Sequence, residues 1–365
     1  MMNSTPFSRN QYCRVSDAIT YCDFRVVVLE NEFLKIVVLP EKGAEVYSLV
    51  YKPRDMDVLF KRDKLRKPDP YPAAVINSDS GFMDAYAGGW QELFPSGGAP
   101  SKVKGASFGM HGEVTLLPWH WKIIEDSAER VAVCFWVELM RMPFRLERVM
   151  SLEKGSAILT LEEKIENLGV EKLPYMWGHH PSFGAPFLDE NCVIDAPARK
   201  VAVHQDKVLD GHRLIPGSTG EWSRMQGQKG MEDLRRIPAL SEKTVDMFYL
   251  TELQAGWFAL TNQKTGMGVA MQWDAEIFPH IWVWQEFGGS TGYPWYSNTY
   301  ALGLEPFTSF SPNAGSGLEE VMREGNHRVL AAGEFLESSL KVIAYQQNDI
   351  QGVETVSPSG KVVYK

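Results

Sequence analysis

The sequence has few of the features that mark membrane proteins or nucleic-acid-binding proteins. Its longest strictly apolar stretches are short, such as residues 131–137, whereas a membrane-spanning helix needs about 20 apolar residues. Its 37 Lys and Arg residues are outnumbered by 46 Asp and Glu residues, which gives a formal net charge of −9. Because nucleic-acid binding requires a basic face, we expect neither a nucleic-acid partner nor a membrane partner.

Cysteine is also scarce. The four cysteines, Cys13, Cys22, Cys134 and Cys192, show no C-x-x-C spacing and lie in apolar or strand-like segments. This pattern is typical of reduced thiols in a cytoplasmic protein, although a bridge between Cys13 and Cys22 stays open. Residues 1–10 contain no apolar segment of the kind that a signal peptide needs. We therefore predict a cytoplasmic location.

Signals for β-strands dominate the chain. Residues 24–29 and 33–39 are rich in Val and Leu and flank the polar residues 30–32, which predicts a hairpin. Residues 131–140, 144–152 and 156–165 predict a meander. Further strands are expected at 46–51, 192–195, 201–204, 245–250, 257–261, 268–273, 281–285, 299–305 and 335–345. Short runs separated by Gly, Pro or Asn are typical of an all-β sandwich or barrel.

Helical signals are few. Residues 317–324 predict one short helix, and residues 232–236 are a weaker candidate. Two polar, Gly-rich segments, 61–108 and 205–243, read as long loops, and such loops often carry binding groups in a large β scaffold. No linker or internal repeat divides the chain, so we expect a single domain over residues 1–365, as a monomer or homodimer.

Histidines in aromatic or Gly-rich surroundings are the first candidates for chemistry. His111 lies in the sequence Gly-Met-His-Gly, where a flanking glycine allows close approach to a ligand. His179 and His180 are neighbours in a strand-like segment, so that only one of them faces a given side of a sheet. Each of these histidines could equally be a loop residue or a hydrogen-bonded core residue.

Two carboxylates interrupt apolar strands. Glu305 lies within residues 301–307, and burying its carboxylate costs several kcal/mol unless the group is paired, hydrogen-bonded or protonated. Such a residue is either a structural ion-pair member or a site residue with a raised pKa. Asp246 begins the apolar strand at 245–250, where a polar strand start is the simpler interpretation.

Signals for cofactors are missing. There is no H-E-x-x-H metal motif, no Gly-rich phosphate loop and no G-x-S-x-G nucleophile elbow. His111 with Glu113, or His179 with His180, offers metal-ligand atoms without the usual spacing of a metal site. We therefore expect neither a metal nor another cofactor.

Taken together, these sites resemble the aldose 1-epimerase (galactose mutarotase-like) superfamily in the order of its motifs. The likeness rests on the segments Met110-His111-Gly112, His180-Pro-Ser-Phe183, Asp246-Met-Phe-Tyr-Leu250 and Leu304-Glu305. It covers about residues 32–345. The segment 88–95 is more similar to the hexose-6-phosphate epimerase branch, and Gly112 is followed by a Glu where galactose mutarotases usually carry a second Gly after the His.

The resemblance implies a large antiparallel β-sandwich and a sugar site that needs no cofactor. It also implies that Glu305 is the general base, that His180 is the general acid, and that His111 and Asp246 hold sugar hydroxyls. We add three candidates for substrate binding: Gln91, Trp177 and Gln285. Four tryptophans could supply an apolar platform for a sugar face, namely Trp90, Trp177, Trp284 and Trp295.

The sequence therefore predicts an aldose 1-epimerase acting on a monosaccharide. Proton transfer to and from the sugar needs one carboxylate and one imidazole, and no metal or nucleotide. Alternatives are a hexose-6-phosphate 1-epimerase, a non-catalytic carbohydrate-binding protein and a glycoside hydrolase that pairs Glu305 with Asp246 or Glu286. We expect His111, His180, Asp246 and Glu305 to converge on one cleft whose rim includes the loop 81–110.

Overall fold

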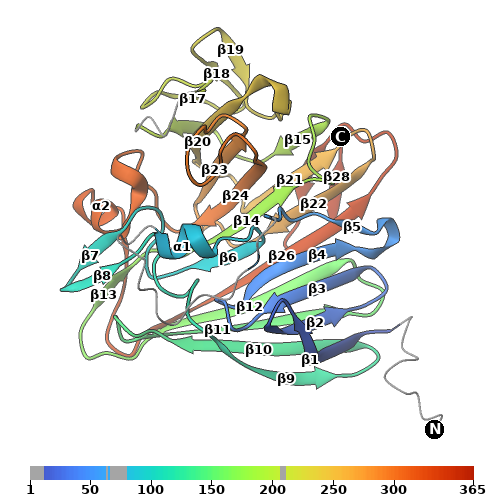
Figure 1. Cartoon of the computed structure of the whole chain (residues 1–365), viewed down its shortest axis with the longest axis vertical. Coiled ribbons are helices and arrows are strands. Elements are labelled where there is room, and N and C mark those ends of the chain that lie inside the picture. Colours follow the sequence, from blue (N-terminus) through green and yellow to red (C-terminus); the bar gives the residue numbers. More distant parts are fainter. Residues whose placement is uncertain (1–11, 63–64, 66–79, 206–210) are drawn as a thin grey trace.

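The structure, a computed structural model, describes residues 12–62, 65, 80–205 and 211–365, and two large antiparallel β-sheets form its body (Figure 1). The larger sheet runs in the order β1 (Arg14–Tyr21), β2 (Phe24–Glu30), β3 (Leu34–Leu39), β4 (Glu45–Tyr51), β6 (Trp90–Leu93), β14 (Gly178–Gly184), β24 (Tyr300–Phe307), β23 (His280–Phe287), β20 (Thr244–Thr251), β16 (Lys200–Val203) and β17 (Thr219–Glu221), with β5 (Met56–Asp57) beside β4. The second sheet runs in the order β15 (Cys192–Asp195), β21 (Trp257–Asn262), β22 (Met267–Gln272), β26 (Phe335–Gln346), β12 (Ile158–Asn167), β11 (Phe144–Glu153), β10 (Arg130–Glu138) and β9 (His120–Asp126).

Smaller elements surround the two sheets. Four two-stranded pairs consist of β7 (Ser101–Val103) with β8 (Ala106–Phe108), β13 (Leu173–Tyr175) with β25 (Arg328–Leu330), β18 (Arg224–Gln226) with β19 (Met231–Asp233), and β27 (Val353–Val356) with β28 (Val362–Tyr364). The helices are α1 (Ser80–Ala85), α2 (Leu318–Arg323) and the 3-10 turns η2 (Lys52–Arg54), η3 (Leu240–Glu242) and η4 (Ala314–Ser316). In Figure 1, α1 lies in front of the larger sheet, near β6 and β14.

The N-terminal hairpin shows how short polar turns fix the fold. The side-chain oxygen of Asn31 accepts hydrogen bonds from the backbone N–H groups of Phe33 and Leu34 at 2.9 and 2.8 Å, which closes the turn between β2 and β3. Its side-chain nitrogen donates to the backbone carbonyls of Glu153 and Ser156 at 2.7 Å each. One buried asparagine therefore ties the larger sheet to the second sheet.

The hydrophobic core fills the space between the two sheets. Side chains alternate along each strand, so that Leu146 and Met150 of β11 are buried while Glu147 is half-exposed. From the larger sheet, Leu302 and Leu304 of β24 join the same apolar cluster. The intervening positions of β24, among them Glu305, point to the opposite face of the larger sheet.

A polar network is buried inside this core. The guanidinium of Arg148 lies 3.1 Å from Glu92, and the indole N–H of Trp177 donates to the same carboxylate at 2.7 Å. His179 lies 3.2 Å from Glu163, and all five side chains are almost completely buried. Because an unpaired buried charge is costly, this arrangement neutralises Arg148 and the carboxylates against one another.

The all-β fold predicted from the sequence is confirmed, including the hairpin, the meander and the short helix near residue 320. The weaker helix prediction at 232–236 is wrong, since residues 231–233 form β19. The predicted loop 61–108 contains α1 and a strand of the larger sheet, β6; its residues 63–64 and 66–79 lie outside the described residues. The predicted loop 205–243 contains three short strands, β17, β18 and β19, and its residues 206–210 are likewise not described.

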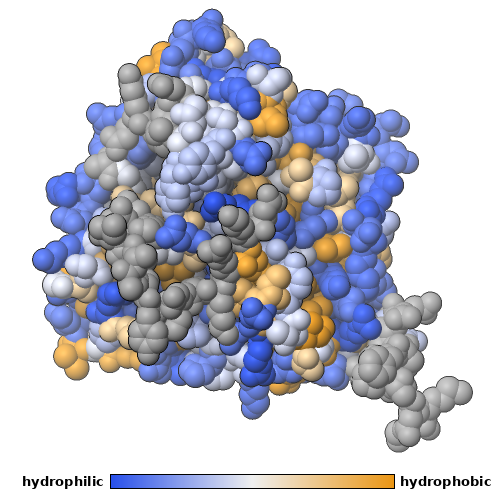
Figure 2. All heavy atoms as spheres, in the orientation of Figure 1, coloured by the Kyte–Doolittle hydropathy of each residue, from blue (hydrophilic) through white to orange (hydrophobic). Residues whose placement is uncertain are grey.

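The surface is mixed in character. On the face shown in Figure 2, hydrophobic residues form small patches among hydrophilic ones. Among the described residues, we find no helix that is long and apolar enough to span a lipid bilayer. The prediction for residues 1–10, which concerned a signal peptide, lies outside the described part of the chain.

Candidate active site

A cavity of about 200 Å³ lies on the face of the larger sheet that points away from the second sheet. Strands β14, β20, β23 and β24 form its floor, and residues on and around α1 form one wall. The lining residues are mostly aromatic or sulfur-containing, with three histidines and one carboxylate among them. They are Phe82, Met83, Tyr86, Gly98, Met110, His111, His180, His204, Met247, Tyr249, Trp282, Trp284, Trp295, Glu305 and Gly315.

His180 and Glu305 meet on the floor of this cavity. The antiparallel register pairs Gly178 with Phe307 and Ser182 with Gly303, which puts His180 of β14 directly opposite Glu305 of β24. The Nε2 atom of His180 lies 3.4 Å from Oε1 of Glu305. An acid–base pair therefore follows from strand register, without any contribution from a flexible loop.

Burial favours the uncharged forms of Glu305 and His180. Glu305 is 2% exposed, and burial raises the pKa of its carboxyl well above the usual range. His180 is 6% exposed, and burial lowers the pKa of its imidazole to about 4. Because low polarity disfavours each charged form, burial favours the state in which the pair holds one proton and carries no net charge. That proton is available for transfer to a ligand.

A short hydrogen-bond chain orients His180. The hydroxyl of Tyr86 donates to Oγ of Ser182 at 2.7 Å, and Oγ of Ser182 lies 3.1 Å from Nδ1 of His180. Ser182 is two residues from His180 on the same face of β14. Gly303 leaves the space that Glu305 needs, since a Cβ atom there would lie 2.4 Å from Oε1 of that carboxylate.

His111 closes one side of the cavity on a strained backbone. Its φ of +63° lies in the left-handed region, which is uncommon for residues other than glycine and is often found at functional sites. Its ring centroid lies 4.4 Å from that of Phe82 and 5.3 Å from that of His180. Burial, and then the nearby His180, holds the pKa of His111 well below its usual range. Its buried Nδ1 has no hydrogen-bond partner among the described residues, so a neutral ring is available to a ligand hydroxyl.

Asp246 and Gln285 do not line the cavity, contrary to the convergence expected from the sequence. They are paired across β20 and β23, and their side chains point to the other face of the sheet from Met247 and Trp284. Both bind Arg213, whose Nε lies 3.0 Å from Asp246 and whose Nη2 donates to Gln285 at 2.7 Å. The resemblance had implied that Asp246 holds a sugar hydroxyl, but strand alternation turns its side chain toward Arg213.

The two remaining candidates, Gln91 and Trp177, are not among the residues that line the cavity. Gln91 is the neighbour of His180 on β6, and its Nε2 donates to the carbonyl of Gly88 at 2.6 Å, while its buried Oε1 has no partner among the described residues. Trp177 belongs to the core network with Glu92. The tryptophans suggested as a platform for a sugar face lie in two places. Trp284 and Trp295 line the cavity, whereas Trp90 lies in the core.

Several lining residues were not identified from the sequence. Met247 and Tyr249 alternate with Asp246 along β20, and that alternation was a signal for a second face. His204 follows β16, and its Nδ1 lies 2.8 Å from the hydroxyl of Tyr249. The wall residues Phe82 and Tyr86 carried no signal, because they come from a segment without clear periodicity. As expected, the loop 81–110 contributes to the rim through its described residues.

One group of described residues has ligand atoms close enough together to hold a metal ion. These are Glu92, Glu163 and His179, whose ligand atoms all lie within 4.8 Å of one another. Burial raises the pKa of each glutamate to about 7, and burial lowers that of His179 to about 4. The guanidinium of Arg148, 3.1 Å from Glu92, already places a fixed positive charge in this group. It opposes a second cation, so the residues fit a metal poorly.

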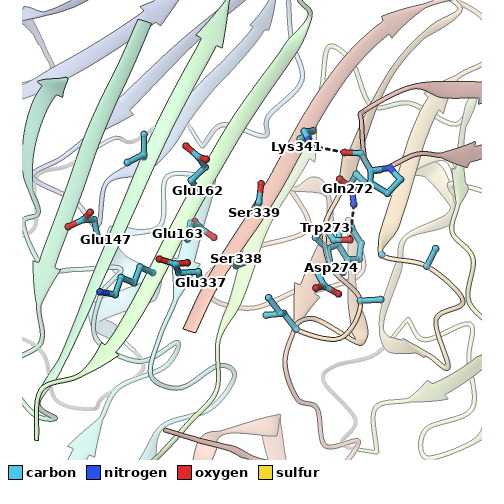
Figure 3. A pocket seen from close by; sticks show the side chains of 17 residues that line it. Glu147, Glu162, Glu163, Gln272, Trp273, Asp274, Glu337, Ser338, Ser339 and Lys341 are labelled. Atoms are coloured by element: carbon cyan, nitrogen blue, oxygen red, sulfur yellow. Dashed lines mark hydrogen bonds between the residues drawn. The ribbon is translucent and has the colours of Figure 1, made fainter. Parts of the chain in front are cut away.

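A larger cavity of about 850 Å³ lies along the second sheet. Figure 3 shows Glu147, Glu162, Glu163 and Glu337 on neighbouring strands, with Trp273 and Asp274 across from them. Its lining includes carboxylates and lysines but no histidine. The acid–base pair and the unpartnered His111 make the smaller cavity the better candidate for chemistry.

Comparison with known proteins supports this fold assignment. Residues 23–342 match the family model described as Domain of unknown function (DUF4432), and the chain belongs to this family. A comparison with curated proteins finds no match.

Solved structures of similar fold span most of the chain. A Klebsiella pneumoniae protein provisionally named an aldose 1-epimerase aligns with a TM-score of 0.67 and 14% identity, over 92% of this chain and 84% of that one. A galactose mutarotase-like protein from Clostridium acetobutylicum aligns with a TM-score of 0.64 and 15% identity, over 92% and 99% of the two chains. A galactose mutarotase related enzyme from Lactobacillus acidophilus gives 0.58 and 15%, over 89% and 98%. The galactose mutarotase-like fold suggested by the sequence is thereby confirmed.

Proposed function

We propose that this member of the DUF4432 family is an aldose 1-epimerase, which interconverts the α and β anomers of a monosaccharide. The observation that carries the proposal is the pair His180–Glu305, 3.4 Å apart on the floor of an aromatic cavity. Aromatic rings offer an apolar surface to one face of a sugar, and a carboxylate with an imidazole supplies a base and an acid.

The reaction needs one proton taken and one proton given. From the ionised pair, the carboxylate of Glu305 removes the proton of the anomeric hydroxyl as the C1–O1 bond becomes a carbonyl. The C1–O5 bond breaks, and O5 takes a proton from the imidazolium of His180. The open aldehyde then turns about its C1–C2 bond, and the reverse transfers close the ring from the other face.

Burial favours this chemistry at the ring-opening step. Opening converts the carboxylate and imidazolium into a neutral carboxyl and a neutral imidazole, which are the forms that burial stabilises. The hydrogen bond between Nδ1 of His180 and Oγ of Ser182 would hold one ring proton on Nδ1, so that the exchanging proton is the one on Nε2, which faces Glu305. His111 lines the cavity beside His180, and its neutral ring would hold a sugar hydroxyl.

Two alternatives lose support from the geometry. A glycoside hydrolase needs two carboxylates about 5–9.5 Å apart, but Asp246 points to the other face of the sheet. Glu286 is paired with Ala301, four residues from Glu305 along β24, which corresponds to roughly 13 Å. Its carboxylate is also hydrogen-bonded to Ser290.

A sugar-phosphate substrate would need cations at the cavity. No Lys or Arg is among the lining residues in the described part of the chain. Outside that lining, Arg148 is buried with Glu92 and Lys104 binds Glu171 at 2.6 Å. Lys102 and Arg141 line a separate cavity together with two carboxylates, Glu113 and Glu319.

The proposal is tested by Glu305→Gln, measured by NMR saturation exchange between anomers. The amide keeps the shape of the side chain but cannot accept the proton, so we expect the catalysed exchange rate to fall by about 10²–10⁴-fold. Glu286→Gln is the matched control, since it removes a buried carboxylate beside the cavity floor without touching the pair. Exchange by Glu305→Gln at the catalysed wild-type rate would mean that Glu305 is not the base. Sugar binding by the wild-type protein without exchange above the uncatalysed rate would mean that it is a carbohydrate-binding protein.

A further inference from the structure

The wall of the cavity is unusually poor in groups that can bind hydroxyls. Three methionines reach it from separate elements: Met83 from α1, Met110 from the segment before His111, and Met247 from β20. A thioether is only a weak hydrogen-bond acceptor, and its flexible chain adapts to apolar shapes. Trp284 and Trp295 add a second apolar surface, with ring centroids 5.2 Å apart.

Some polar groups of the wall are already used within the protein. The hydroxyl of Tyr86 donates to Ser182, so that Tyr86 presents its ring to the cavity. The indole N–H of Trp282 donates to the carbonyl of Ser309 at 3.0 Å. The hydroxyl of Tyr249 is within 2.8 Å of both His204 and Ser316.

The methionine part of the wall is a poor partner for the hydroxyls of a sugar. A hexopyranose carries five hydroxyls and a ring oxygen, and the proposed reaction engages the anomeric hydroxyl and the ring oxygen with Glu305 and His180. Burying another hydroxyl against a thioether without a partner is unfavourable. A hydrogen or methyl group at the same position would carry no such penalty.

The charged groups near the cavity further restrict the class of ligand. The guanidinium of Arg62 lies 5.5 Å from the ring centroid of Trp295 in the aromatic wall. Its Nη1 donates to the carbonyls of Met83 and Tyr86 at 3.1 Å each, which leaves it engaged with the backbone of the wall. A phosphate or carboxylate on the sugar would therefore face Glu305 without a compensating charge among the described lining residues.

We propose that the substrate is an uncharged deoxy monosaccharide, in which hydrogen or a methyl group replaces a polar substituent of the parent sugar. The inference rests on the proposed function and concerns the substrate class of the same cavity. Its size agrees, because about 200 Å³ is below the ~300–1,000 Å³ of pockets for drug-sized ligands and suits one sugar ring. The methionine wall recognises the deoxy position, and His180 with Glu305 acts on the anomeric centre.

The test compares sugars that differ only at one hydroxyl. D-Galactose with D-fucose, and D-glucose with 2-deoxy-D-glucose, form matched pairs, and D-glucose 6-phosphate probes charge. We expect kcat/KM for anomer exchange to be about 10–100-fold higher for at least one deoxy sugar than for its parent. D-Glucose 6-phosphate should not exchange above the uncatalysed rate.

Methionine variants identify the recognising wall. Met110→Gln and Met247→Gln introduce an amide of similar length, and at least one should shift the deoxy-to-parent ratio of kcat/KM about 10-fold toward the parent. Met231→Gln, at an exposed position on β19, is the control and should leave the ratio unchanged.

The outcomes separate this inference from the proposed function. Catalysed exchange with parent sugars equal to or faster than their deoxy partners would overturn the deoxy inference and leave the epimerase proposal standing. Preferred binding of a deoxy sugar in saturation-transfer NMR, without catalysed exchange, would overturn the epimerase proposal and keep the ligand class. Neither binding nor exchange with any of these sugars would overturn both.

Discussion

The Nε2 atom of His180 and the Oε1 atom of Glu305 lie 3.4 Å apart on neighbouring strands, β14 and β24, of one sheet. The distance is set by backbone hydrogen bonds of the ladder, which hold both side chains on one face. A site built on strands in this way is more precise than one built on loops. The predictions below start from this pair and from the polar network behind it.

The pH profile of anomer exchange should be bell-shaped. The pair is active while it holds one proton, because His180 must donate a proton to the sugar and Glu305 must accept one from it. Addition of a second proton near pH 4, the pKa to which burial lowers His180, removes the base. Loss of the remaining proton at the raised pKa of Glu305 removes the acid. Exchange rates measured from pH 3 to 10 should give a plateau through neutral pH, and a rate that falls steadily below pH 7 would contradict this view.

We expect Arg148 to be essential for stability but not to contact the sugar. Arg148→Met leaves Glu92 buried without its cation, which should lower the free energy of unfolding by about 3–5 kcal/mol. Arg145→Met on the same strand breaks only solvent-accessible pairs, with Glu147 and Glu138, for which about 0–1 kcal/mol each is expected. Urea denaturation of both variants gives the comparison. Equal losses would mean that the buried network contributes no more than a surface ion pair.

We expect a substitution at Asp246 to lower stability and a substitution at His111 to weaken substrate binding. Asp246→Asn weakens charge-assisted hydrogen bonds to Arg213, so stability should fall by about 1.5–3 kcal/mol while kcat stays near the wild-type value. His111→Gln should raise KM with little change in stability, because Nδ1 of His111 has no described partner to lose. Thermal unfolding and exchange kinetics measured on both variants test this. A loss of kcat in Asp246→Asn without a loss of stability would return Asp246 to the site.

Chelation should have no effect on either activity or stability. The proposed proton transfers need no Lewis acid, and Arg148 supplies the positive charge beside Glu92, Glu163 and His179. After dialysis against EDTA, we expect an unchanged exchange rate and an unchanged melting temperature. A melting temperature that drops with EDTA and recovers with Zn²⁺ would assign a metal to these three residues.

Much of the fold could be predicted from the sequence because alternation and turn residues are local signals. The hairpin of β2 and β3 consists of two apolar runs that flank a polar turn. In the meander, β11 and β12 alternate as half-buried strands do. Strand β6 has no such pattern, since its four residues, with Gln and Glu in the middle, are all buried. Its position depends on partners in β14 that are distant in sequence.

The site was predictable in part for the same reason. His111, His180 and Glu305 follow from motif order, and they line one cavity. Asp246 fits the same motif order. The face of the sheet to which its side chain points depends on how β20 pairs with β23, and only the assembled sheet defines that pairing. Likewise, the buried partner of Glu92 could not be identified, because Arg148 comes from the opposite sheet.

Strand β14 carries two neighbouring histidines that lie in different environments. His179 faces the core, where it lies beside Glu163, and His180 faces the cavity. A substitution at His180 would leave the core intact, whereas one at His179 would disturb the packing between the sheets. Under the proposed function, the scaffold lies one substitution, at His180, from a protein that would still fold and still hold a sugar without converting it. Enzymes and sugar sensors can therefore descend from a common ancestor of this kind with little remodelling.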